Sequence, residues 1–209
     1  MAPRNPYPTA AAFMPDTLSM SSLRQAVQRC RGCPLHANAT QAVLGEGRAS
    51  SEVMLVGEQP GDQEDLAGAP FVGPAGKLLD RALEEAGIDR DTTYVTNAVK
   101  HFKWKARGTR RIHDKPSWTE QMACRPWLEA EIALVKPRAL VLMGATAAQS
   151  LLGKSFRVTQ HRGASIDSDL AELVTATIHP SAVLRSDDRE AMFAGLVDDL
   201  RLVAETFAA

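Results

Sequence analysis

Short apolar segments that alternate with helical patterns constrain the fold of this chain most strongly. Residues 53–56 form an unbroken apolar run that ends at Gly57, which predicts a buried strand running into a loop. Residues 94–97, 139–143 and 173–178 are three further candidate strands. Apolar runs without alternation are typical of strands that are covered on both faces of a parallel sheet.

Helical patterns separate these segments. Residues 74–86 and 117–135 carry apolar side chains at helical spacing, and residues 187–207 form a final amphipathic stretch. Ser117 is a candidate N-cap, and Glu120 follows three residues later as in a capping box. Strands that alternate with helices predict an α/β protein, here a three-layer α/β/α sandwich around a central four-stranded parallel sheet.

The chain has 209 residues, which suits one domain. Four prolines within the first 15 residues predict a flexible N-terminal tail over residues 1–21, followed by a single domain over residues 22–209. The apolar stretches between these prolines are too short for a signal peptide or a membrane span. We therefore expect a cytoplasmic protein that does not contact a membrane, and no feature of the sequence argues for more than a monomer.

The overall charge does not point to a polyanionic partner. Apolar residues make up 44% of the chain and charged residues 23%, and the formal net charge is −1. These values are ordinary for a soluble globular protein. Any contact with nucleic acid must therefore come from a local patch of basic side chains.

Polar motifs follow three of the four predicted strands. Glu58 and Gln59 come after the first strand, Asn97 ends the second, and His179 follows the fourth. Each residue also has a structural alternative, as a turn cap, a partner of backbone groups or a buried hydrogen-bonded histidine. In parallel sheets, however, ligands bind at the carboxyl ends of the strands. Together these side chains predict a site that recognises a small polar ring.

Three cysteines and one histidine are candidate metal ligands. Cys30 and Cys33 form a C-x2-C pair, Cys124 is the remaining cysteine, and His101 lies in a loop after a predicted strand. The alternative is that the cysteines are ordinary buried thiols. Three cysteines and one histidine suit structural zinc. Iron–sulfur clusters usually take four cysteines, although histidine replaces cysteine in some, so the spacing leaves both metals open.

A basic loop lies between the second strand and the next helix. Residues 100–115 contain seven Lys or Arg and one Asp, interleaved with Phe102 and Trp104. Cations bind phosphate and aromatic rings stack on bases, so this pattern indicates contact with single-stranded or distorted nucleic acid. The alternative is a solvated charged loop. Because it follows a strand end at the predicted site, we favour the nucleic-acid interpretation.

His113 closes the basic segment Arg110-Arg-Ile-His113. A lone histidine more often has a structural role. Here two arginines precede it beside the expected path of the phosphates, and a neutral imidazole is a competent base or nucleophile near physiological pH. His113 is therefore a candidate catalytic residue.

Several of these motifs resemble those of the family 4 uracil-DNA glycosylases. The similar segments are Gly57-Glu-Gln-Pro-Gly61, Phe71-Val-Gly-Pro-Ala-Gly76, Tyr94-Val-Thr-Asn97 and His179-Pro-Ser181. The C-x2-C pair resembles the cluster-binding cysteines of that family. The resemblance extends from about Cys30 to the C-terminal helix.

Within that superfamily, the chain resembles most closely UdgX, a bacterial branch that becomes covalently attached to uracil-containing DNA. The first motif is Gly-Glu-Gln-Pro-Gly, His101 stands where family 4 enzymes have a cluster cysteine, and the basic loop ends at His113. The UdgX loop usually has the sequence Lys-Arg-Arg-Ile-His, whereas this chain has Thr109 in place of the lysine. The UdgX segment His-Pro-Ser-Ser-Leu is His-Pro-Ser-Ala-Val here.

The resemblance implies a function and a set of roles. It implies a [4Fe–4S] cluster on Cys30, Cys33, His101 and Cys124, and uracil-containing DNA, preferably single-stranded, as the partner. It implies uracil contacts from Gly57, Gln59, Phe71 and Asn97, and stabilisation of the departing base by His179. His113 would attack C1′ of the sugar with help from Glu58. The expected DNA contacts come from Lys100, Arg110, Arg111, Ser181 and Arg185.

Two other functions are compatible with parts of the sequence. One is a turnover glycosylase that releases uracil, in which His113 only binds or gates. The other is a non-catalytic iron–sulfur protein that binds DNA or transfers electrons. The latter explains the cysteines and the basic loop, but it does not explain why Glu58, Asn97 and His179 are expected at one edge of the sheet.

Overall fold

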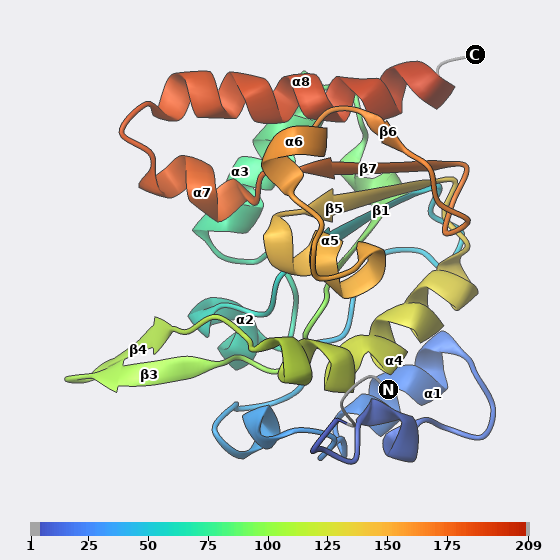
Figure 1. Cartoon of the computed structure of the whole chain (residues 1–209), viewed down its shortest axis with the longest axis vertical. Coiled ribbons are helices and arrows are strands. Elements are labelled where there is room, and N and C mark those ends of the chain that lie inside the picture. Colours follow the sequence, from blue (N-terminus) through green and yellow to red (C-terminus); the bar gives the residue numbers. More distant parts are fainter. Residues whose placement is uncertain (1–4, 208–209) are drawn as a thin grey trace.

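A parallel sheet forms the centre of the molecule, as predicted. The computed structural model describes residues 5–207. Strands β1 (Val53–Gly57), β2 (Thr93–Asn97), β5 (Ala139–Met143) and β7 (Leu173–Thr177) are parallel, in the order β2-β1-β5-β7 (Figure 1). The two-residue strand β6 (Ser165–Ile166) adds an antiparallel edge beside β7. It is too short to give a sequence pattern, and so was not predicted.

Eight α-helices and three 3₁₀ helices accompany the strands in the described residues. The 3₁₀ helices are η1 (Ala10–Phe13), η2 (Pro34–Ala37) and η3 (Arg90–Thr92). The α-helices are α1 (Met20–Val27), α2 (Asp62–Ala67), α3 (Pro74–Glu85), α4 (Trp118–Val135), α5 (Ala145–Leu152), α6 (Val158–His161), α7 (Pro180–Arg185) and α8 (Arg189–Phe207). The predicted capping box of Ser117 and Glu120 is present at the start of α4.

Alternate side chains of the strands pack into two different hydrophobic cores, one on each face of the sheet. Val53 and Leu55 of β1 pack with side chains of α3, α7 and α8, whereas Met54 and Val56 pack with α4, α5 and α6. Successive side chains of a strand point to opposite faces, so a strand covered on both sides has to be apolar throughout. This arrangement confirms the three-layer sandwich.

From Asn5 on, the N-terminal segment is packed against the domain, whereas the sequence predicted a flexible tail over residues 1–21. Met1–Arg4 lie outside the described residues. Ala10 in η1 is fully buried, and the Thr9 backbone N–H donates to the Gly32 carbonyl at 3.1 Å. The apolar residues between the prolines thus form a 3₁₀ turn that packs against α4. Short apolar stretches are sufficient to hold the segment in place, because they join a third hydrophobic core beside α4.

This third core joins α1, η1 and η2 to one side of α4. It contains all three cysteines together with Leu23, Val27 and Trp127. Within the part of the chain that the structure describes, we find no helix with the length and apolar character needed to cross a membrane.

A buried ion pair ties β2 to α4. Lys100 and Glu131 form a salt bridge, and both side chains are fully buried. Lys100 Nζ also donates to Thr96 Oγ1 at 2.8 Å and to the Asn97 carbonyl at 2.6 Å. The Glu131 carboxylate accepts further hydrogen bonds from the Gly45 backbone N–H, the Tyr94 hydroxyl and Thr96. The prediction that Lys100 contacts DNA is therefore wrong, because its ammonium group is sealed inside the protein.

Replacing Glu131 with Gln is expected to destabilise the fold by about 3–5 kcal/mol, because every group that faces the carboxylate is a donor and Lys100 would keep an incompletely compensated buried charge. Chemical denaturation measures the difference. Glu129→Gln on the same helix is the control, since Glu129 pairs with Arg125 at the surface and such pairs contribute about 0–1 kcal/mol. Equal stability of the two variants would contradict this interpretation.

Candidate active site

The register between β1 and β2 brings two motifs together. Gly57 lies opposite Asn97, and the pairing continues beyond the strands. The Ala98 backbone N–H donates to the Gly57 carbonyl at 2.9 Å, and that of Val99 donates to the Glu58 carbonyl at 3.0 Å. Glu58 and Asn97 are thus held at the same edge of the sheet by backbone hydrogen bonds alone.

Phe71, Asn97 and His179 converge on Gly57, and we call these four residues the Gly57 cluster. A Cβ atom on Gly57 would clash with Asn97 Oδ1 and would lie 2.7 Å from Phe71 Cζ and 3.3 Å from His179 Nε2. The Phe71 and His179 rings are stacked with centroids 6.1 Å apart. The missing side chain at Gly57 is what allows an aromatic ring, an amide and an imidazole from three distant segments to meet.

Phe71 has a strained backbone conformation at the position where its ring enters the Gly57 cluster. Its φ of 57° lies in the left-handed region, which costs a non-glycine residue about 1–2 kcal/mol. Gly76 of α3 lies directly against the Phe71 carbonyl, where any side chain would overlap it. The Glu64 carboxylate accepts hydrogen bonds from the Gly61 and Gly73 backbone N–H groups and so joins the loop after β1 to the loop that carries Phe71.

His179 presents a hydrogen-bond donor to the cluster. The Ser181 backbone N–H donates to His179 Nδ1 at 3.2 Å, so in the neutral ring the proton is on Nε2, the atom near Gly57. Burial lowers the pKa of His179 to about 4, with further lowering from the charges of Arg185 and His113. The imidazole is therefore neutral at physiological pH. The hydroxyl of Ser181, a predicted DNA contact, lies 2.8 Å from the same Nδ1.

The predicted basic loop is a β-hairpin. Strands β3 (Trp104–Arg107) and β4 (Arg110–His113) are antiparallel and project from the body of the molecule (Figure 1). Gly108, with a φ of 60°, and Thr109 form the connection. Thr109 is thus an exposed residue of the turn, at the opposite end of β4 from His113.

Gln59 clamps the base of this hairpin. Its Nε2 donates to the carbonyls of Lys103 and Asp114, both at 3.1 Å, and its Oε1 accepts from the Lys103 backbone N–H at 3.1 Å. The side chain is buried, with 6% of the residue exposed. The prediction that this amide contacts uracil is corrected by these bonds, because three of its hydrogen-bonding positions are already occupied by the segments that flank the hairpin.

Arg111 anchors the hairpin to α2. It forms ion pairs with Asp62 and Asp65, both at 2.6 Å. Its guanidinium also lies over the rings of Phe102 and Trp104. The predicted contact of Arg111 with DNA phosphate is therefore corrected to a structural role, since both carboxylates already neutralise it.

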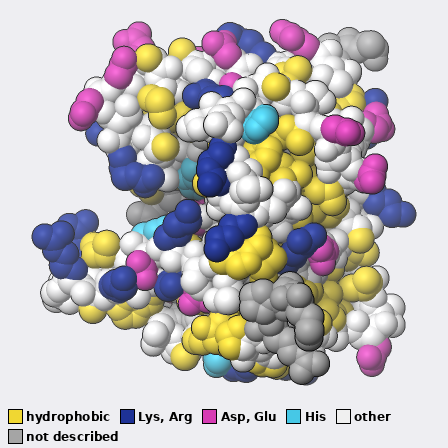
Figure 2. Space-filling model, in the orientation of Figure 1, with side chains coloured by type: hydrophobic (Ala, Val, Ile, Leu, Met, Phe, Trp, Pro, Cys, Tyr) yellow, Lys and Arg dark blue, Asp and Glu magenta, His cyan; other side chains and the backbone are white. Residues whose placement is uncertain are grey.

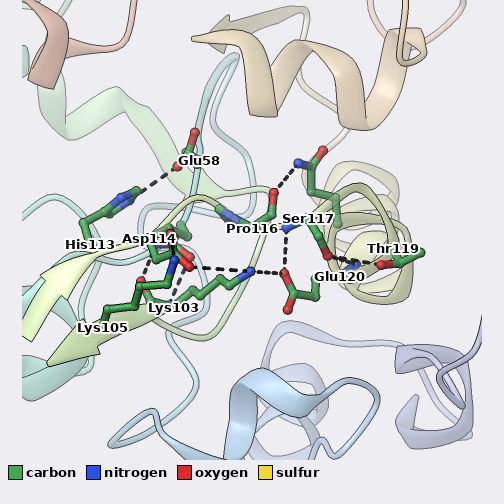
Figure 3. Close-up of polar contacts among 11 residues, drawn as sticks. Glu58, Lys103, Lys105, His113, Asp114, Pro116, Ser117, Thr119 and Glu120 are labelled. Atoms are coloured by element: carbon green, nitrogen blue, oxygen red, sulfur yellow. Dashed lines mark hydrogen bonds and ion pairs between the residues drawn. The ribbon is translucent and has the colours of Figure 1, made fainter.

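His113 faces the carboxylate of Glu58. His113 Nε2 lies 3.3 Å from Glu58 Oε1, and 48% of the histidine side chain is exposed (Figure 3). The other carboxylate oxygen, Oε2, accepts a hydrogen bond from Thr146 Oγ1 at 2.5 Å. Thr146 could not be identified from the sequence, because a threonine in the first turn of a helix has no distinguishing pattern.

Most cations of the hairpin segment are paired within the protein. Lys103 pairs with Glu120 at 2.9 Å and Lys105 with Asp114 at 3.1 Å (Figure 3). Arg107, Arg110 and Lys115 are exposed, and they take part in none of the ion pairs found among residues 5–207. Figure 2 shows Lys and Arg side chains at the tip of the projecting hairpin and on the adjacent flank of the body. The local positive surface is thus smaller than the sequence implied.

The three cysteines are buried thiols in the third core. The Trp127 indole N–H donates to Cys30 Sγ at 3.3 Å, and the Lys100 backbone N–H donates to Cys124 Sγ at 3.2 Å. None of the cysteines is in a disulfide. Burial raises the pKa of Cys33 to about 11 and that of Cys124 to about 12.

His101, the fourth predicted ligand, is also buried, with 4% of the residue exposed. Burial lowers its pKa to about 4, and the neighbouring charges of His36 and Arg31 act in the same direction. Within the described residues, the His, Cys, Asp and Glu side chains form no group of three or more that could hold a metal ion. The metal site therefore stays a prediction.

Replacing Gln59 with Leu is expected to release the base of the hairpin, because two backbone carbonyls and one N–H lose their partner. The backbone amides of the hairpin should then exchange with solvent about tenfold faster or more, while those of the central sheet remain protected. Hydrogen exchange measured by mass spectrometry tests this. Gln63→Leu, at an exposed position of α2, is the control, and identical exchange in both variants would contradict the clamp.

The sequence is similar to those of known proteins of one superfamily. The sequence profile of the uracil DNA glycosylase superfamily matches residues 44–201. A type-4 uracil-DNA glycosylase of Thermotoga maritima is 40% identical over 172 residues, which cover 82% of this chain and 86% of the relative. The type-4 enzyme of Pyrobaculum aerophilum is 35% identical over 175 residues, with 80% and 86% covered, and that of Sulfurisphaera tokodaii 36% over 174 residues, with 79% and 76%. The chain therefore belongs to the uracil-DNA glycosylase superfamily.

Proposed function

We propose that this protein excises uracil from DNA and that His113 then bonds to C1′ of the same nucleotide, as UdgX does. The observation that carries the proposal is the contact between His113 Nε2 and Glu58 Oε1 at 3.3 Å. It joins a nucleophile to a base beside the Gly57 cluster. The His113 side chain is half exposed and could form its hydrogen bonds with water. Its contact with a carboxylate therefore supports a chemical role.

The Gly57 cluster provides the groups that a flipped-out uracil needs. Phe71 offers a ring for stacking and Asn97 an amide for the polar edge of the base. None of the hydrogen bonds found among residues 5–207 uses the Asn97 side chain, so its amide is available to a ligand. His179 directs Nε2–H to the same region. Gly57 has no side chain of its own, so these three groups can surround the base closely.

Cleavage of the glycosidic bond leaves positive charge on the sugar and negative charge on the base. The electron pair of the bond departs with uracil, and the neutral His179 donates a hydrogen bond to the resulting anion. Glu58 accepts the Nε2 proton of His113, and the freed electron pair of Nε2 forms the bond to C1′. The proton finally passes to uracil, so that the products are neutral uracil and a protein–DNA adduct.

The adduct should be stable, because imidazole is a poor leaving group from C1′. The protein would thus act once, as a monomer that traps uracil. Base flipping requires unstacking, which costs least in single strands, and so we expect single-stranded DNA to react faster than duplex DNA. The exposed Arg107, Arg110 and Lys115 are the hairpin cations left for phosphate.

A turnover glycosylase is the second candidate, and its support is the similarity to type-4 enzymes over most of the chain. In that case Glu58 activates water, and His113 only helps to hold the substrate. Uracil release is common to both candidates, so they differ in the fate of C1′ alone.

His113→Ala is expected to abolish the adduct and to retain uracil release, because Glu58 remains and water can enter the space left by the imidazole. Wild-type protein should shift a single-stranded uracil oligonucleotide on a denaturing gel, and released uracil can be measured in the same samples. His161→Ala, which changes an exposed histidine on α6, is the control and should form the adduct normally. A shifted band that persists in His113→Ala contradicts capture by this residue.

We also propose that Cys30, Cys33, His101 and Cys124 hold a [4Fe–4S] cluster, with structural zinc as the alternative. The support is chemical. The thiols share one buried core without forming disulfides. N–H groups of Trp127 and Lys100 already point at two of the sulfur atoms, and such hydrogen bonds tune cluster-bound thiolates. Once bound, the cluster would cross-link the N-terminal segment, the loop after β2 and α4.

Purified protein should therefore be brown and contain iron, and Cys124→Ser should lose iron and melt at a lower temperature than wild type. Metal analysis and absorbance spectra measure the first effect, and thermal denaturation measures the second. A colourless protein that contains zinc and no iron would overturn the cluster in favour of the zinc site.

A further inference from the structure

Strand β5 also contributes to the site, through Thr146, which lies in the helix that follows it. Strand β5 lies next to β1, so that its carboxyl end is adjacent to Glu58. The chain leaves β5 at Gly144, whose φ is 88°, and enters α5 directly. Thr146, in the first turn of α5, is fully buried. Its hydroxyl hydrogen-bonds to Glu58 Oε2 at 2.5 Å.

The direction of this hydrogen bond follows from the chemistry of the two groups. An ionised carboxylate can only accept, so the Thr146 hydroxyl donates. Glu58 therefore has one oxygen fixed by Thr146 and the other turned to His113 Nε2. A carboxylate held at one oxygen cannot rotate freely, so the direction of its second oxygen is defined.

Thr146 is itself held rigidly. The Gly144 backbone N–H donates to the Thr177 carbonyl of β7 at 2.8 Å, which fixes the start of α5 to the edge of the sheet. One turn later, the Ser150 hydroxyl donates to the Thr146 carbonyl at 2.7 Å. Ser150 thus satisfies the backbone of its own helix, which is the ordinary use of a buried hydroxyl in a helix. The Thr146 hydroxyl instead crosses to another strand.

We propose that Thr146 is a positioning residue that orients Glu58 toward the reacting group at C1′, so that Thr146, Glu58 and His113 act in series. This inference rests on the proposed function, because it assigns Thr146 to the same reaction. Thr146 does not touch the substrate. It determines which way the carboxylate faces, whether that carboxylate takes a proton from His113 or from water.

Thr146→Val should slow the reaction without disturbing the packing, because the two side chains have nearly the same shape. A hydrogen bond to a charged group contributes about 1.5–3 kcal/mol, which corresponds to a rate lower by about 10- to 100-fold. Thr146→Ser keeps the hydroxyl and should restore most of the rate. Thr175→Val removes a buried hydroxyl in the same way, but that hydroxyl donates to the Ala164 carbonyl and contacts neither Glu58 nor Thr146. It is the matched control and should react at the wild-type rate.

The experiment uses full-length protein in excess over a single-stranded uracil oligonucleotide, so that one turnover is followed. Released uracil and protein–DNA adduct are measured separately for wild type, Thr146→Val, Thr146→Ser, Thr175→Val, Glu58→Gln and the double variant Thr146→Val/Glu58→Gln. If Thr146 acts through Glu58, the valine substitution adds no further loss in the Glu58→Gln background. Thermal denaturation of each variant checks that it is folded.

The outcomes separate this inference from the function on which it rests. A wild-type rate in Thr146→Val, or an equal loss of rate in the presence and absence of the Glu58 carboxylate, overturns the role of Thr146. Uracil release without adduct in wild type overturns covalent capture, whereas the effect of Thr146 is still measured on uracil release. If wild type yields neither product, the proposed function and this inference fail together.

Discussion

The parallel pairing of β1 with its two neighbours is the constraint on which the site depends. Because β1 lies between β2 and β5, the residues that follow the three strands meet at one edge. The register places Gly57 opposite Asn97, and the absence of a side chain at Gly57 lets Phe71 and His179 close over them. Both faces of the sheet are covered by helices, so this edge is where polar chemistry can be exposed without disrupting a core.

The hairpin brings His113 to this edge of the sheet. Its base is clamped by Gln59, Arg111 anchors β4 to α2, and His113 is thereby held against Glu58. The anchoring also changes what the basic residues do. Most of them neutralise carboxylates of the protein, so the positive charge left for DNA is concentrated near the tip and base of the hairpin. The contacts of the hairpin thus position His113 against Glu58 more than they provide positive charge for DNA.

Local patterns were predictable from the sequence, and so was the meeting of Glu58, Asn97 and His179, because it follows from the order of the strands. Individual pairings of side chains that are distant in sequence were not predictable. The four parallel strands followed from apolar runs, and the start of α4 from Ser117 and Glu120, three positions apart. By contrast, Lys100 pairs with Glu131, 31 residues away, and Arg111 pairs with Asp65, 46 residues away. A basic side chain with a distant acidic partner has the same sequence pattern as one that binds phosphate. The resemblance to the glycosylases implied DNA contacts for both residues and a uracil contact for Gln59, and the sequence contains no signal of the internal partners that they have instead.

The most direct test of the account is whether a covalent bond to DNA forms and which residue carries it. Protein that has reacted with a uracil oligonucleotide can be digested with nuclease and protease and examined by mass spectrometry. We predict that the deoxyribose remnant is found on the peptide that contains His113, with fragmentation assigning it to the imidazole. A remnant on another residue, or complete release of uracil with unmodified protein, would contradict capture by the hairpin histidine.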